Sequence, residues 1–476
     1  MSAVPFRIVD IEFRERPVRL RLPFRFGVVT LTHAPQAFAF ARIELADGRT
    51  SLGAAAEMLA PKWFDKNLAL SNEQNFDQLR TALAIARGLY LDRASRTAFG
   101  HFAVHYADQV EAAARHDLNP LVAGYGPALI DRAVLDALCR ALGVSFYDAI
   151  RRNIVGIVPA GLLPEFAGFD IDRFVGRLSP RNRIAARHTV GLVDPITAAD
   201  IKPGQRVGDG LPETLEEVVT AYGHSWFKLK VGGDVAKDIV RLSAIASVLD
   251  RSPSPYRCTL DGNEQYDDVD GVIALWRKMG ETPALRRLVS SIAFIEQPIN
   301  RKTALERDVA ALGKEKPLII DESDGDFDAF PRARSLGYAG VSSKTCKNFY
   351  KSILNAARCA MWNEVAGRQA YFMSGEDLTT QAGLSVQQDL ALVSLLGLDH
   401  VERNGHHYVN GMADLPPSEQ QAFLTAHPDL YQRADGVVRL KIESGMLAMG
   451  SLGCTGFASG ALPEIAATQP MPALAA

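Results

Sequence analysis

The chain has 476 residues, 47% hydrophobic and 22% charged, values typical of a globular protein large enough for more than one domain. Its formal net charge of −3 gives no basic excess that would indicate a nucleic-acid or membrane-surface partner. Five scattered cysteines without a C-x-x-C pair argue against a disulfide framework or a thiolate zinc site, and they favour a reducing, cytoplasmic location.

The first 150 residues predict an α+β domain. Charged residues appear too early in MSAVPFRIVDIEFRE for a signal peptide. Residues 6–60 are rich in short apolar runs, and Asp47-Gly48 forms a turn signal between two of them, which predicts antiparallel strands. From 72 to 151 the apolar residues recur with helical spacing, and Gly143 is the expected stop of the last long helix.

From about residue 183 short apolar segments alternate with amphipathic ones. Eight such βα units in roughly 220 residues predict a (β/α)8 barrel. A doubly wound sheet also alternates, but no Gly-rich nucleotide fingerprint is found, which favours the barrel. The predicted strands are 183–193, 226–231, 256–263, 292–299, 317–323, 339–347, 369–377 and 400–404.

The remaining segments do not follow the barrel rhythm. Residues 152–182 and 194–212 contain Pro, Gly and Asp and resemble insertions beside the first barrel strand. The segment 436–444 suggests a strand that returns to the first domain, and the apolar run 390–398 is too short to span a bilayer. We therefore expect an α+β capping domain at 1–150, a connecting insertion at 151–182, the barrel at 183–410, and at 411–476 a C-terminal segment that returns to the capping domain and ends in a mobile Ala/Pro-rich tail.

Charged side chains follow five successive predicted strands. Active sites of such barrels lie at the carboxyl ends of the strands, so these side chains are expected to meet at the barrel mouth. Any one of them alone has an ordinary explanation, such as an exposed strand face or a helix N-cap, and only the ordered set points to a site. In strand order the set is Lys228 and Lys230, Asp261 with Asn263, Glu296, Asp321 with Glu322, and Lys344 with Lys347.

The three carboxylates Asp261, Glu296 and Asp321 come from adjacent strands and would repel one another unless a cation neutralised them. An all-oxygen ligand set selects Mg²⁺, with Mn²⁺ as the alternative, over zinc. The metal would act as a Lewis acid on a substrate carboxylate. The pattern thus predicts a divalent metal site that binds a small carboxylate.

The lysines fit a role as proton-transfer groups. Lys228 and Lys230 alternate with one residue and therefore face the same side of a strand. Burial and mutual repulsion are expected to lower their pKa values, which would make a neutral amine accessible. Lys344 lies four strands away and should face them across the barrel.

At this point the motifs resemble a known family. The segments FKLKVGG, DGN, IEQP, DES and SSKTCKN, together with the helix ALIDRAVLDALCRALGVSFYDAI, are similar to those of the enolase superfamily, in particular the muconate-lactonizing and mandelate-racemase-like enzymes. The resemblance implies a modified TIM barrel capped by an α+β domain built from both ends of the chain. It also implies a homo-oligomer, Mg²⁺ on Asp261, Glu296 and Asp321, and abstraction of the proton α to a substrate carboxylate to give an enediolate on the metal.

The resemblance also assigns roles to the lysines. Lys230 and Lys344 would be the base or acid on opposite faces of the substrate, and Lys228 would assist Lys230. No histidine follows the seventh strand, so the lysine pair resembles the muconate-lactonizing subgroup. The expected reaction is racemisation, epimerisation or cycloisomerisation. Dehydration of an acid sugar or another lyase reaction remains an alternative, as do Schiff-base chemistry and a non-catalytic carboxylate-binding barrel.

Several polar residues near the predicted mouth have no firm assignment. His33 lies in the loop 25–34, which by analogy covers the substrate. Glu376 and Asp377 would contact a polar group of the substrate or cap the next helix. His406 and His407 follow the last strand, and we expect them to serve loop or surface packing rather than a metal. Asn263, Glu322 and Lys347 complete the group of residues expected to support the site or contact the substrate.

Overall fold

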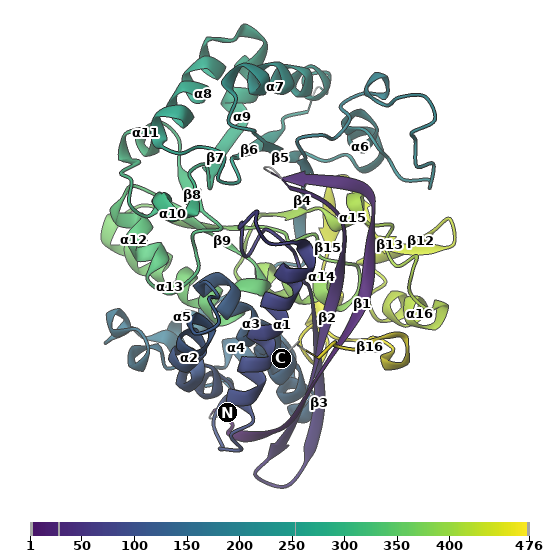
Figure 1. Ribbon diagram of the computed structural model, residues 1–476. Coiled ribbons are helices and arrows are strands. Elements are labelled where there is room, and N and C mark those ends of the chain that lie inside the picture. The colour runs from purple at the N-terminus through teal and green to yellow at the C-terminus, as the bar shows by residue number, and fades with distance from the viewer. Residues whose placement is uncertain (1–2, 27–28, 253, 474–476) are drawn as a thin grey trace.

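A computed structural model describes residues 3–26, 29–252 and 254–473 (Figure 1). Figure 1 shows a ring of strands with outer helices, and beside it a sheet of long strands packed with helices from the N-terminal region. The predicted loop 25–34 contains residues 27–28, and the predicted tail ends with residues 474–476. These residues lie outside the described ranges.

The N-terminal sheet is antiparallel, as predicted. Strands β1 (Phe6–Phe26), β2 (Val29–Leu45) and β3 (Thr50–Met58) pair in chain order. The turn between β2 and β3 holds Gly48 at φ 84°, a conformation that glycine adopts without steric cost. A short strand near the chain's end, β16 (Gln469–Pro470), pairs with the outer edge of β1.

Helices cover one face of this sheet. Ser71 and Gln74 form a reciprocal capping box at the start of the first helix, and Gly143 ends the third helix in the left-handed conformation, as predicted. The third helix packs directly on β3 because Gly53 leaves no side chain between them: a Cβ there would lie 2.2 Å from the Ala133 carbonyl oxygen. The helices are α1 (Asn72–Tyr90), α2 (Ala98–Ala114), α3 (Pro120–Leu142) and α4 (Phe146–Arg151).

The barrel prediction is confirmed. Within the described ranges eight parallel strands pair in chain order, and the last pairs with the first to close the ring. Each strand lies inside a predicted segment and is shorter than it, because pairing stops where the chain turns toward the next helix. The strands are β4 (Arg183–Val190), β5 (Trp226–Lys230), β6 (Arg257–Asp261), β7 (Ile292–Glu296), β8 (Leu318–Ile320), β9 (Gly340–Ser343), β10 (Phe372–Gly375) and β11 (His400–Arg403).

The helices between the barrel strands form its outer layer (Figure 1). Buried residues of β5–β9 and of the helices that cover them form one core, whereas most of those of α13, α14 and β11 join the core of the N-terminal sheet. The predicted insertion before the barrel holds α5 (Ile171–Arg177). The outer helices are α6 (Leu215–Tyr222), α7 (Val235–Leu249), α8 (Val269–Glu281), α9 (Arg286–Ser291), α10 (Arg301–Ala304), α11 (Ala310–Glu315), α12 (Ala329–Ser335), α13 (Phe349–Ala366), α14 (Leu384–Leu395) and α15 (Gly405–Tyr408).

The segment after the barrel differs from the sequence prediction. The predicted returning strand 436–444 does not join the N-terminal sheet. Its first part, β13 (Val437–Leu440), pairs with β12 (Tyr431–Ala434), and its end, β14 (Ile442–Glu443), pairs with β15 (Met446–Ala448). Strand β15 in turn pairs antiparallel with β4 and so extends the barrel sheet. One helix, α16 (Pro417–Ala426), precedes β12.

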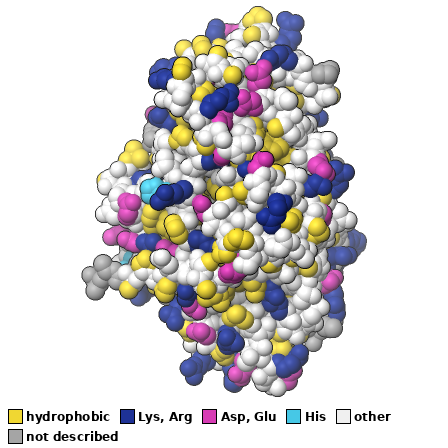
Figure 2. All heavy atoms as spheres, turned by 90° about the vertical axis from the view of Figure 1, so that its right-hand side faces the viewer, with side chains coloured by type: hydrophobic (Ala, Val, Ile, Leu, Met, Phe, Trp, Pro, Cys, Tyr) yellow, Lys and Arg dark blue, Asp and Glu magenta, His cyan; other side chains and the backbone are white. Residues whose placement is uncertain are grey.

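The surface carries both signs of charge. On the face shown in Figure 2, basic and acidic side chains are interspersed with small hydrophobic patches. The five cysteines are free thiols, and four of them are buried. Within the described ranges, no helix combines the length and the apolar character that crossing a membrane requires.

Candidate active site

The charged side chains predicted to meet at the barrel mouth do so. Lys228 and Lys230 lie on β5, Asp261 ends β6, and Glu296 ends β7. The other members follow β8 and β9 directly. One cavity is lined by Lys228, Lys230, Asp261, Asn263, Asp321 and Lys344.

Local contacts explain the residue types found at these strand ends. The Oε1 atom of Gln297, in the sequence IEQP, accepts hydrogen bonds from the backbone N–H groups of Asp321 and Ser323. These bonds connect the end of β8 to the end of β7. Gly262, of the sequence DGN, passes so close to Pro298 that a Cβ would lie 2.5 Å from its Cα atom. These contacts hold Asp261 and Asp321 at neighbouring positions on the rim.

Lys228 is the centre of the charged network. Its Nζ lies 2.8 Å from carboxylate oxygens of Asp261, Glu296 and Glu376, and 2.9 Å from Glu402. The lysine side chain is 1% exposed. A buried ammonium surrounded by four carboxylates is a strong structural tie between β5, β6, β7 and the last two strands of the barrel.

The other two cavity lysines each pair with one carboxylate. Lys230 donates to Asp261 Oδ2 at 2.6 Å, and Lys344 donates to Asp321 Oδ2 at 2.7 Å. Strands β5 and β9 lie four positions apart in the ring of eight, so these lysines occupy opposite sides of the barrel. The two faces of a ligand held between them would each meet one lysine.

The expected lowering of the pKa is wrong for Lys228. Burial by itself lowers the pKa of Lys228, but the four surrounding carboxylates outweigh it and hold the pKa well above its usual value. Lys344 behaves in the same way, because the Asp321 carboxylate more than offsets its burial and raises its pKa. The sequence showed the neighbouring lysines but not the number of carboxylates that converge on them.

The carboxylates have the donor chemistry of a hard-cation site. Asp261, Glu296 and Asp321 are buried at the ends of three successive strands, and Glu296 Oε2 is buried without a hydrogen-bond partner. Burial and the neighbouring Asp261 carboxylate raise the pKa of Glu296 well above its usual value, which marks a local excess of negative charge. The three groups fit Mg²⁺ in ligand type.

The lysines, however, now hold these oxygens apart. The three carboxylates do not bring one oxygen each to within 4.8 Å of the other two, as a preformed cation site would. Lys228 contacts both Asp261 and Glu296. Binding of a dication by this set therefore requires Lys228 to give up at least part of these contacts.

The cavity is narrow and largely apolar on the side of the N-terminal domain. The cavity volume is about 30 Å³, which is room for roughly two water molecules. The Lys344 ammonium lies 4.3 Å from the centre of the Trp63 ring, a cation–π contact that closes one wall. A larger ligand would have to displace some of the apolar wall, which is formed by Phe24, Phe26, Leu31, Met58, Trp63 and Leu378.

Three of the residues predicted near the site do not line the cavity. His33 is exposed on β2 and does not line the cavity. Lys347 is buried beside the site, where it contacts Asp324 at 3.0 Å and Asp321 at 3.4 Å. Glu322 accepts a hydrogen bond from Asn263 Nδ2 at 3.0 Å, and its burial raises its pKa to about 7.

The end of the seventh strand contributes two acidic side chains to the site region. Glu376 does not line the cavity but lies beneath it, between Lys228 and Arg187. Asp377 lines the cavity and pairs with Arg403 of β11 at 2.9 Å. Both acidic residues belong to the internal charge network, and of the two predicted roles only the capping of the following helix α14 is wrong.

Sequence reasoning missed Glu402 and Trp63. Glu402 is on β11, lines the cavity, and accepts hydrogen bonds from Lys228 and Thr189. It could have been found, because it is a carboxylate within the segment HVERN at the end of a predicted strand. Trp63 lies in a loop after β3, and nothing in the sequence indicates that this loop reaches the barrel mouth.

Comparisons with known proteins identify the fold. A scan against family models found no match, and a search of curated proteins found none either. Among solved structures, a dipeptide epimerase from Enterococcus faecalis V583, complexed with Mg and the dipeptide L-Leu-L-Tyr, matches with a TM-score of 0.60 at 13% identity, over 95% of this chain and 99% of that chain. Muconate lactonizing enzyme from Pseudomonas fluorescens, complexed with muconolactone, matches with a TM-score of 0.57 at 18% identity, over 95% and 96%.

A third solved structure matches over a similar share of both chains. The 2-chloromuconate cycloisomerase from Rhodococcus opacus 1CP gives a TM-score of 0.58 at 16% identity, over 97% of this chain and 98% of that chain. The architecture is thus a (β/α)8-type barrel with an α+β cap, matched over nearly its whole length. The chain thus shares the fold of these epimerase and cycloisomerase structures, a capped barrel of the kind that the resemblance implied.

Proposed function

We propose that this protein is a Mg²⁺-dependent enzyme of the muconate-lactonizing type, which abstracts the proton α to the carboxylate of a small substrate. The observation that carries the proposal is the placement of Lys230 and Lys344 on opposite sides of one cavity that is also lined by Asp261 and Asp321. The structures with the same fold include epimerases and cycloisomerases.

The chain's own groups would perform the proton transfer. One lysine amine takes the proton from the α-carbon, and the other lysine returns a proton on the opposite face, which inverts the centre. Lys228 stays charged within its four carboxylates and lines the same cavity, so it would stabilise negative charge on the substrate. The apolar wall around Trp63 would exclude water from the reacting carbon.

Asp261, Glu296 and Asp321 would hold the metal. When bound, Mg²⁺ would act as a Lewis acid at the substrate carboxylate and would offset the carboxylate charge that raises the pKa values of Lys228 and Lys344. Mn²⁺ offers the same coordination chemistry with oxygen ligands.

Racemisation, epimerisation and cycloisomerisation are the reactions that the lysine pair supports best. No histidine is found among the cavity-lining side chains of the described residues. A histidine acid that would assist departure of a hydroxyl group is thus lacking at this wall, which favours these reactions over dehydration. A carboxylate-binding barrel without catalysis is the alternative from another class, and it would show no exchange of the α-proton.

Proton NMR in D₂O tests the proposal. N-acylamino acids, dipeptides and muconates of defined configuration would be screened for α-proton exchange with Mg²⁺ present. We expect Lys230→Ala and Lys344→Ala each to lower exchange on one face by about 100- to 10,000-fold. The control Lys314→Ala, at an exposed position, should leave exchange unchanged.

Two results would contradict the proposal. If both lysine variants retained exchange on both faces, the two-base assignment would be wrong. If Asp261→Asn bound Mg²⁺ as tightly as the unmodified protein in a calorimetric titration, the metal assignment would be wrong.

A further inference from the structure

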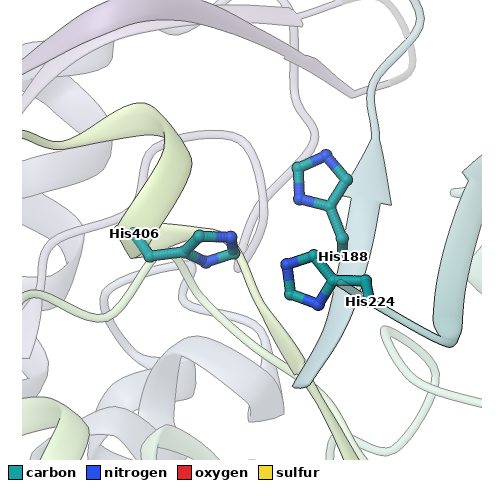
Figure 3. A group of neighbouring side chains, drawn as sticks. All are labelled: His188, His224 and His406. Atoms are coloured by element: carbon teal, nitrogen blue, oxygen red, sulfur yellow. The ribbon is translucent and has the colours of Figure 1, made fainter. Parts of the chain in front are cut away.

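A second cluster of metal-binding side chains lies on the outer side of the barrel wall. His188 is on β4, His224 lies just before β5, and His406 is in α15, which follows β11. Strand β4 is flanked by β5 and β11, so three neighbouring segments converge where the barrel closes. Figure 3 shows His406 pointing from its helix toward the rings of His188 and His224.

The three rings form a nearly regular triangle. Their centroids are 5.4 Å apart for His188 and His224, 5.6 Å for His188 and His406, and 5.5 Å for His224 and His406. One ring nitrogen from each lies within 4.8 Å of the other two. Nitrogens bound at 2.0–2.1 Å around a tetrahedral ion are roughly 3.3 Å apart, so side-chain rotations that bring the ring nitrogens to this separation would complete the site.

The cluster is separate from the carboxylate centre. Side chains alternate across a strand, and on β4 both Arg187 and Thr189 point into the barrel, where they contact Glu376 and Glu402. His188, between them, therefore points outward. Strand β4 stands between the histidine cluster and the charged network around Lys228.

Ring nitrogens in the cluster have no protein partner. His188 Nδ1, His224 Nε2 and both nitrogens of His406 are buried and without a hydrogen bond. The three residues are between 2% and 7% exposed. Buried polar atoms are almost always paired in folded proteins, so several orphaned nitrogens that face one another call for a ligand.

The tautomer of His224 is the one that metal binding requires. Its Nδ1 lies 2.8 Å from the Ala186 carbonyl oxygen, which can only accept a hydrogen bond, so Nδ1 carries the proton. Nε2 is then left with a free lone pair aimed at the cluster. A backbone carbonyl that orients the ring through its other nitrogen is the usual outer support of a metal-bound histidine.

The electrostatic environment favours neutral rings. Burial, reinforced by the neighbouring histidines, lowers the pKa values of His188 and His406 well below the usual value, and burial lowers that of His224 to about 4. At neutral pH the three imidazoles therefore keep the lone pairs that a cation needs. His407, whose Nδ1 is also unpartnered, stands beside the set with its ring centre 4.9 Å from that of His188.

We propose that His188, His224 and His406 bind one divalent transition-metal ion of the Zn²⁺ or Co²⁺ type. The ion would link the segments next to β4, β5 and β11, where the barrel closes. Three imidazoles suit such an ion and not Mg²⁺, which prefers oxygen ligands. The fourth position is open to water or His407. From the sequence, His406 was expected to serve packing, because its partners lie about 180 and 220 residues earlier in the chain and only the fold brings them together.

Cobalt binding tests the site. Untagged protein would be stripped with a chelator, returned to buffer with excess Mg²⁺, and titrated with Co²⁺ while the visible d–d absorption is recorded. We expect one Co²⁺ per chain and at least a 100-fold weaker affinity for His188→Gln and for His406→Gln. His427→Gln, which alters a buried histidine outside the cluster, should leave the titration unchanged.

Two further variants keep the test decisive. His406→Cys retains a ligand, and it should add a thiolate-to-cobalt charge-transfer band that appears only if position 406 binds the ion, even where the glutamine variants fold poorly. Asp261→Asn must give the same cobalt spectrum as the unmodified protein. The proposal is overturned if Co²⁺ does not bind stoichiometrically, if the histidine variants bind it equally well without the thiolate band, or if Asp261→Asn abolishes the spectrum.

Discussion

Among the described side chains of the site, Lys228 forms the most ion pairs. Its ammonium contacts Asp261, Glu296, Glu376 and Glu402 at 2.8–2.9 Å in a buried setting. A charge at this depth is tolerated only when it is paired and hydrogen-bonded. The residue therefore has a structural task in addition to any role toward a substrate.

Replacement of Lys228 by methionine tests this task. Removing one partner of a buried ionic network leaves uncompensated charge, so we expect Lys228→Met to lower the free energy of unfolding by about 3–5 kcal/mol at pH 7 without divalent ions. Equilibrium urea denaturation measures it. The exposed Lys237→Met, whose lysine pairs with Asp234 at the surface, should leave it nearly unchanged. A similar small loss for Lys228→Met would refute the central role.

At the scale of elements, close backbone approach positions the cap. Helix α3 crosses α1 so tightly that a Cβ at Gly126 would lie 2.2 Å from the Ala82 carbonyl oxygen. The same helix packs on β3 at Gly53. The absence of side chains at these two positions sets the distance between the helices and the sheet whose loop carries Trp63.

Two alanine substitutions in α3 separate packing from helix propensity. Gly126→Ala should destabilise the protein by about 1–3 kcal/mol, because the added methyl forces α1 and α3 apart. Gly124→Ala, where nothing lies within 4 Å of the new Cβ, should be neutral or stabilising by up to about 1 kcal/mol. Thermal unfolding followed by circular dichroism compares them, and equal melting temperatures would disprove the tight crossing.

For the whole molecule, buried neutral histidines contribute to the response to acid. Burial lowers the pKa values of His101 and His427 to about 4, although Asp429 near His427 opposes the shift there. A depressed pKa means that the unfolded chain takes up protons first. The stability that these residues contribute is complete above about pH 6.5 and is lost as the pH falls toward 4.

His427→Gln makes this response measurable. Each such histidine contributes a slope of up to about 1.4 kcal/mol per pH unit between these limits. The glutamine variant, which can still bond Ser451, should show a shallower loss of unfolding free energy between pH 6 and 4.5 in urea titrations. An unchanged slope would mean that His427 is charged in the folded protein.

The sequence by itself determined the strands of the barrel, the antiparallel sheet and the helices of the N-terminal region. Hydrophobic periodicity and turn residues are local signals, and they fix local structure. It also determined the order of the charged residues at the barrel mouth from Lys228 to Lys344. Successive charged residues are separated by about one βα unit, so each lies at the end of the next strand. The muconate-lactonizing resemblance rests on those same motifs.

Only the tertiary structure decided which charges meet. The sequence could not show that Lys228 contacts four carboxylates, because two of them, Glu376 and Glu402, come from strands far along the chain. The four carboxylates raise the pKa of Lys228, whereas a lowered pKa was expected. Trp63 reaches the cavity from another domain, and the segment 436–444 pairs with β12 and, through β15, with the barrel sheet instead of with the first sheet. His188, His224 and His406 became a cluster for the same reason: closure of the barrel joins its last strand to its first, and no local pattern records that contact.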